Sequence, residues 1–93
     1  MLRHYAPHIP LRLNALDPQE DEAFLAFGES PPLGAKITLN LSPQSNLMEA
    51  AANLFYMLRK ADSPDYKGIA VMPIPETDLG LAINDRLKRA AHK

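Results

Sequence analysis

The sequence contains no cysteine, which excludes disulfide bonds and zinc sites built from thiolates. This absence is consistent with a reducing compartment, and we expect a cytoplasmic protein. An excess of charge of one sign is also lacking, because ten basic and eleven acidic residues give a formal net charge of -1. Without a positive field there is no general attraction for a phosphate backbone, so we expect no direct binding of nucleic acid.

Long hydrophobic runs are absent as well. No apolar stretch approaches the roughly 20 residues that a helix needs to cross a bilayer. The first ten residues contain two histidines and two prolines where a signal peptide would have its apolar core. We therefore expect no membrane partner. A chain of 93 residues suits one small domain that buries about 60–65% of its unfolded surface.

Proline is abundant, and its nine positions divide the chain. Pro7 and Pro10 favour extended backbone, both at their own positions and in the residues before them. We predict that residues 1–9 form a linker and that residues 10–93 form the folded domain. The apolar and aromatic groups of the linker have no evident partner in so small a domain, so we expect residues 1–7 to be mobile or held by a neighbouring molecule.

Four segments predict strands. Residues 11–16 begin with alternating polarity, residues 23–27 are apolar on both faces, residues 35–41 place Ile37, Leu39 and Leu41 on one face, and residues 68–75 form a buried run closed by prolines. Between them, residues 17–22 predict an acidic turn, and residues 29–34, with paired prolines and a glycine, predict a loop.

Two segments predict helices. Asn46 and Glu49 have the spacing of a capping box, which predicts a helix over 46–62 that ends near Pro64. Thr77 or Asp78 can cap a second helix. The apolar stripes expected to face the core are Leu47, Ala50, Ala51, Leu54, Phe55, Leu58 and Ala61 in the first helix, and Leu79, Ile83, Leu87 and Ala90 in the second. The order strand, helix, strand, helix over 35–92 predicts parallel neighbouring strands and a right-handed crossover.

Several motifs carry a family resemblance. They are His4-Tyr5-Ala6-Pro7, the following Pro10-Leu11-Arg12-Leu13, Asn53-Leu54-Phe55 in the first helix, and Gly80 ahead of Ala82-Ile83-Asn84-Asp85-Arg86-Leu87. In this order they resemble the C-terminal domain of the two-domain threonylcarbamoyl-AMP synthases, the longer members of the Sua/YrdC/YciO/YwlC group. The resemblance extends from His4 to Ala91.

The resemblance implies a parent nucleotidyltransferase that makes threonylcarbamoyl-AMP from threonine, bicarbonate and ATP, for threonylcarbamoyladenosine modification of tRNA. Its N-terminal catalytic domain is the implied partner. The basic and Ser-Asn motifs of that domain have no counterpart here, so this chain is expected to have no catalytic residue, metal or cofactor of its own. The linker with His4, Tyr5 and Pro7 is implied to lie over the active-site mouth.

The implied fold is a small Rossmann-like α/β domain of two or three layers, with about four strands in a largely parallel or mixed sheet and two main helices. Many relatives have a full helix between their first two strands. Here only about nine residues separate these strands, too few for a crossover helix. The first strands are therefore expected to be antiparallel or joined by a simple loop.

Other candidate sites have simpler alternatives. His4 and His8 lie four residues apart without nearby carboxylates, so we interpret them as solvated, not as metal ligands. Tyr5 can stack on a nucleotide or pack on its own domain. Ser42, Ser45 and Asn46, before the first helix, are a possible anion site, although capping explains them as well. Methionines 48, 57 and 72 fit core or interface positions.

Two charged clusters also have simpler explanations. Asp17, Glu20, Asp21 and Glu22 are interpreted as a solvated turn, since nothing in the sequence indicates that they are buried. The basic end of the second helix, with Arg86, Lys88, Arg89 and Lys93, complements the helix dipole without requiring tRNA phosphates.

Two functions remain open. One is a non-catalytic domain that docks on the catalytic domain and gates it. The other is a stand-alone Rossmann-like module that binds a small molecule or nucleotide at the carboxyl ends of its strands. In either case an exposed docking surface also allows self-association.

Overall fold

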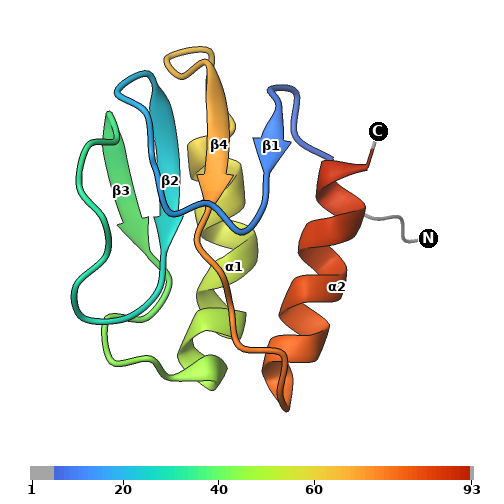
Figure 1. The fold of residues 1–93 in the computed structure, drawn as a ribbon. Coiled ribbons are helices and arrows are strands. Elements are labelled where there is room, and N and C mark those ends of the chain that lie inside the picture. Colours follow the sequence, from blue (N-terminus) through green and yellow to red (C-terminus); the bar gives the residue numbers. More distant parts are fainter. Residues whose placement is uncertain (1–5, 93) are drawn as a thin grey trace.

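The computed structural model describes residues 6–92. Its elements are β1 (Leu11–Arg12), β2 (Glu22–Ala26), β3 (Ile37–Asn40), α1 (Leu47–Ala61), β4 (Gly68–Val71) and α2 (Leu79–Ala91). The four strands form a single parallel sheet in the order β1-β4-β2-β3 (Figure 1). The predicted α/β class is confirmed.

Both helices pack against one face of the sheet. Side chains alternate along each strand, so Ala23 and Leu25 of β2 and Ile69 and Val71 of β4 point to the helices. The main core contains these residues together with Leu54 and Leu58 of α1 and Ile83 and Leu87 of α2. The opposite face, where Phe24 and Ala70 are buried, packs against Ala15 of the β1–β2 connection, and neither described helix lies over it. Of the two predicted layer arrangements, the two-layer form is therefore the one observed.

The strand connections differ in part from the prediction. β3 and β4 are parallel and joined through α1, as predicted, but they are not neighbours, because β2 lies between them. In Figure 1 the chain runs down β3, returns through α1 behind the sheet and enters β4 on the right, which is a right-handed crossover. β4 occupies a central position because its apolar residues suit burial on both faces.

The first two strands are parallel to β4, one on each side of it, so antiparallel pairing between them was the wrong alternative. Residues 13–21 join them as a simple loop. The backbone N–H of Ala15 in this loop donates to the Val71 carbonyl at 2.8 Å. The loop thus crosses the sheet near the end of β4 and covers the face that has no helix.

Two predicted strands extended too far at their C-terminal ends. β1 ends at Arg12, before Asn14 adopts a positive φ of 54°, and β4 ends at Val71, before Pro73. The first helix agrees with its prediction, and the Asn46 side chain caps it. Asp78 occupies the N-cap position of α2, but its side chain makes no capping bond. The backbone carbonyl of Thr77 accepts the Gly80 N–H instead, at 2.7 Å.

Candidate functional site

The chain enters the domain at the C-terminal end of α1. There the carboxylate of Asp62 accepts the backbone N–H of His8 at 2.9 Å and, more weakly, that of Ile9 at 3.3 Å. The Nδ1 atom of His8 lies 3.0 Å from Oδ2 of the same carboxylate, whose side chain is only 5% exposed. We call this group of contacts the Asp62 clip. It attaches residues 8 and 9 to the end of α1.

The segment before the clip differs from its prediction at Pro7, which is buried. The expectation that residues 1–7 are mobile or held by a neighbouring molecule is therefore wrong for this residue. His4 and Tyr5 lie outside the described residues, and the boundary placed after residue 9 stays a prediction. No sequence pattern indicates the clip, because Asp62 is 54 positions away from His8.

The outer side of α1 carries aromatic side chains under cationic groups. Phe55 is 43% exposed and Tyr56 is 63% exposed. The Arg59 guanidinium lies 5.5 Å from the Phe55 ring centre, and the Lys60 ammonium lies 5.9 Å from that of Tyr56. With Ala52 these four residues line a shallow surface hollow, which we call the α1 outer face. Aromatic side chains are enriched at contacts between proteins, so this face is a candidate docking surface.

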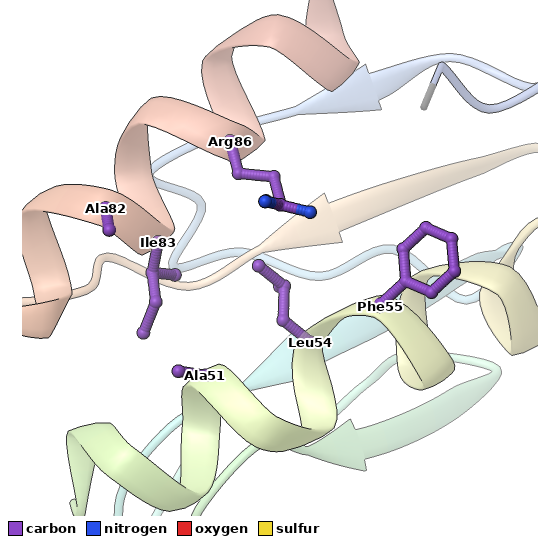
Figure 2. Close-up of a pocket in the computed structure, with 6 residues that line it drawn as sticks. All are labelled: Ala51, Leu54, Phe55, Ala82, Ile83 and Arg86. Carbon is purple, nitrogen blue, oxygen red and sulfur yellow. The ribbon is translucent and has the colours of Figure 1, made fainter. Parts of the chain in front are cut away.

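A second hollow lies between the two helices, with a volume of about 260 Å³. Figure 2 shows its small side chains, Ala51 and Ala82, at one end and Phe55 and Arg86 at the other. Since Phe55 lines both hollows, the second hollow extends the α1 outer face toward α2.

Several residues expected in the core belong to this surface or are otherwise exposed. Ala51 and Phe55 were predicted in the apolar stripe of the first helix, yet both are exposed, as is Leu79 of the second. Met48 is 72% exposed and does not fill the core. The predicted stripe was too wide, because the two helices leave an open hollow between them, and Ala51 and Phe55 line this hollow instead of the core.

The predicted anion site has an internal set of bonds. Ser42 Oγ accepts the Asn46 N–H at 2.9 Å and donates to Glu49 Oε1 at 2.6 Å, while Asn46 Oδ1 accepts the Glu49 N–H at 3.0 Å. Ser45 is exposed and has a positive φ of 59°. These bonds favour the capping alternative, since the Glu49 carboxylate already lies beside the hydroxyl that an anion would use. An anion site here stays a prediction.

The acidic segment is not simply a solvated turn. Glu22 is 9% exposed and begins β2, and its carboxylate pairs with Arg12 Nε at 2.8 Å. Arg12 also reaches Asp17 at 3.0 Å, whereas Glu20 and Asp21 are exposed. Hydrogen bonding to the Arg12 guanidinium lowers the pKa of both paired carboxyl groups. The solvated interpretation is therefore wrong for Glu22.

The pairing of Arg12 with Glu22 depends on the sheet. β4 lies between the strands that carry these two residues, and Gly68, level with Glu22 on β4, has no side chain to occupy the intervening space. A Cβ at position 68 would lie 4.0 Å from Glu22 Oε2. Arg12 therefore connects β1 to β2 across Gly68. Because the Glu22 carboxylate is engaged in this ion pair, we assign it a structural role and not a catalytic one.

The basic residues of α2 have separate surroundings. Arg86 lines the interhelical hollow, and Arg89 pairs with Asp85 one turn earlier at 3.2 Å. Lys88 lines a small hollow at the carboxyl ends of β1 and β4, with a volume of about 20 Å³. Lys93 lies outside the described residues.

The described residues also bear on metal and membrane binding. Within residues 6–92, no group of three or more His, Asp and Glu side chains is arranged to hold a metal ion. Neither described helix has the length and apolar character needed to cross a membrane.

Comparison with known proteins gives one match. A family model described as threonylcarbamoyl-AMP synthase, C-terminal domain, matches residues 1–92. The curated proteins and the solved structures gave no match. The family match covers all the motifs that carried the resemblance.

Proposed function

Because this chain belongs to the family of threonylcarbamoyl-AMP synthase C-terminal domains, we propose that it docks on the N-terminal catalytic domain of its parent synthase and gates the catalytic site. The parent is then a cytoplasmic L-threonylcarbamoyladenylate synthase that uses ATP, threonine and bicarbonate in tRNA modification. This chain contributes no catalytic residue. The observation that carries the docking role is the α1 outer face. The preceding chain enters the domain at the C-terminal end of the same helix.

The α1 outer face is suited to a protein partner. The Phe55 and Tyr56 rings give it apolar area, and burial of that area on docking would supply favourable free energy. Arg59 and Lys60, whose cationic groups lie over these rings, favour a partner surface with carboxylates. A domain joined through the preceding chain is held near this face, which raises its effective concentration there.

The gating role is assigned to residues 1–7 of the predicted linker, which precede the Asp62 clip and which we call the arm. His4 and Tyr5 in this arm are proposed to cover the bound adenylate and to exclude water from its labile mixed anhydride. Substitution of Tyr5 or His4 by alanine in the full-length synthase should then weaken retention of ATP or the adenylate. The fold of this domain should not change. Unaltered nucleotide affinity and turnover in both variants would leave the motif only a tether.

The alternative, a stand-alone nucleotide-binding module, has less support. Such a module would bind its ligand at the carboxyl ends of the parallel strands. In the described part of the chain, the hollow found at the ends of β1 and β4 has a volume of about 20 Å³. That volume holds roughly one water molecule.

The docking proposal can be tested by adding this chain to the separately purified catalytic domain and measuring binding by calorimetry. Tyr56→Asp should weaken binding at least tenfold, because it places a carboxylate on an aromatic contact position. Leu33→Asp is the matched control, since Leu33 is 90% exposed on the β2–β3 loop, away from the helices.

Equal losses in the two variants, or no binding by the unaltered chain, would contradict docking through this face. Sedimentation of the chain alone tests self-association. A dimer broken by Tyr56→Asp, together with no binding to the catalytic domain, would reassign the face to a second copy.

A further inference from the structure

Asp62 places a carboxylate where a helix disfavours one. It is the C-cap residue of α1, at the end where the helix dipole is negative, so the dipole opposes its charge. The side chain is also almost fully buried, and burial of a carboxylate is costly unless hydrogen bonds compensate for lost water. The carboxylate cannot cap the helix, because it has no proton to donate to the last carbonyl groups, and it is the backbone N–H of Asp62 that bonds to the Leu58 carbonyl.

The compensating bonds come from the incoming chain. The backbone N–H of His8 lies 2.9 Å and 3.1 Å from the two carboxylate oxygens, and the N–H of Ile9 lies 3.3 Å from the first. The His8 ring, otherwise highly exposed, adds a contact at 3.0 Å. Among these contacts with described residues, those of His8 N–H and Ile9 N–H come from the backbone, so the carboxylate holds the path of the chain at residues 8 and 9.

The flanking prolines restrict this path further. Pro7 and Pro10 fix their own φ angles and limit the conformations of the residues before them. Pro7 is buried, and the Pro10 carbonyl accepts the Ile69 N–H at 2.8 Å, which fixes the chain at the start of β1. Residues 8 and 9 are thus held between two stiff positions and Asp62, and little freedom remains in the direction of the chain.

We propose that Asp62 is a positioning residue for the arm: by binding residues 8 and 9 to the end of α1, it sets the direction in which the preceding chain leaves the domain. The proposal deepens the gating function above and rests on it for its effect on activity. Loss of the carboxylate should release residues 8 and 9 while the sheet and helices stay folded.

The first test uses this chain alone. It contains no tryptophan, so Ala6→Trp at an exposed position introduces a single fluorescent reporter beside the clip. In this background Asp62→Ala should lower the fluorescence anisotropy. Without the reporter, it should speed amide exchange of His8 and Ile9 at least tenfold, with Leu25 in β2 unchanged. Asp62→Asn keeps one acceptor oxygen and should give intermediate values.

Asp65→Ala is the matched control, because it removes a carboxylate from the same connection at an exposed position. Unchanged exchange of His8 and Ile9 in Asp62→Ala, or equal changes in the Asp65 variant, would overturn the clip. If Asp62→Ala does not fold, Asp62→Asn decides the question by the same exchange measurement.

The second test uses the full-length synthase and separates the clip from the gating function. Asp62→Ala should raise the KM for ATP several-fold, with a smaller effect on kcat, and Asp62→Asn should restore part of the loss. If alanine at His4 and Tyr5 changes nothing, the gating function fails, whether or not the clip holds the chain. If those alanine variants raise KM and Asp62→Ala does not, gating stands and the positioning role of Asp62 is overturned.

Discussion

The hydroxyl group of Ser42 donates a 2.6 Å hydrogen bond to the carboxylate of Glu49, and this contact completes the N-terminal cap of α1. In a capping box the Glu side chain would itself accept the N–H of the cap residue. Here the N–H of the cap residue, Asn46, donates to Ser42 Oγ at 2.9 Å. The buried Ser42 hydroxyl therefore bridges the Asn46 N–H and the Glu49 carboxylate, and it connects the end of β3 to the start of α1.

We expect Ser42→Ala to lower the free energy of unfolding by about 1–3 kcal/mol, because it removes a buried hydroxyl and leaves the Asn46 N–H without its acceptor. Urea unfolding followed by circular dichroism measures this. Ser30→Ala, at an exposed loop position, should change stability by less than about 0.5 kcal/mol. Equal stability of the two variants would show that the Ser42 contact adds nothing.

Gly80 in the first turn of α2 is expected to tolerate no side chain. A Cβ at this position would overlap the carbonyl oxygen of Pro75, so the backbone of the preceding turn would have to shift. Gly80→Ala should destabilise the domain by about 1–3 kcal/mol, although alanine is the better helix former. Thermal unfolding checks this, with Ala82→Ser at an exposed position of the same turn as control. A Gly80→Ala variant that is more stable than the unaltered chain would mean that the helix propensity of alanine outweighs the overlap with the Pro75 carbonyl oxygen.

The ion pairs of Arg12 predict a loss of stability in acid. Hydrogen bonding to Arg12 lowers the pKa of Glu22 and of Asp17 in the folded state. A lowered folded pKa stabilises the protein above the unfolded pKa, ordinarily 4.5 for Glu and 3.8 for Asp, and this stabilisation is lost as pH falls through the folded value.

Stability should therefore fall as the pH is lowered below about 4.5, as measured by urea unfolding at a series of pH values. Glu22→Gln should be less stable than the unaltered chain at pH 7 and should show a weaker dependence on pH in this range. Glu20→Gln, at an exposed position, should keep the original dependence. The same slope in all three proteins would contradict a contribution from the Arg12–Glu22 pair.

The chain alone is expected to show no synthase activity. Without the catalytic domain, no ATP-derived pyrophosphate should be released in the presence of threonine and bicarbonate. A coupled pyrophosphate assay tests this, with the full-length synthase as the positive control. Threonine-dependent release by the purified chain would place catalytic residues within it.

Much of the local structure could be predicted from the sequence. Asn46, followed by apolar residues at helical spacing, predicted α1 and its cap correctly, and the apolar run around Phe24 predicted a buried strand. These elements depend on neighbours within a few positions, which a sequence pattern records directly. The motifs from His4 to Leu87 also indicated the family.

The tertiary structure alone decided how these elements meet. Nothing in the pattern shows that β4 pairs with both β1 and β2, because strand order depends on contacts between segments far apart in the chain. The pairing of Arg12 with Glu22 and the binding of His8 by Asp62 follow from that order. The exposure of Phe55 also follows from the tertiary structure, since an apolar residue on a helix is buried only where another layer covers it. Sequence thus determined the elements and the family, and packing decided which charged groups are paired and which aromatic residues reach the surface.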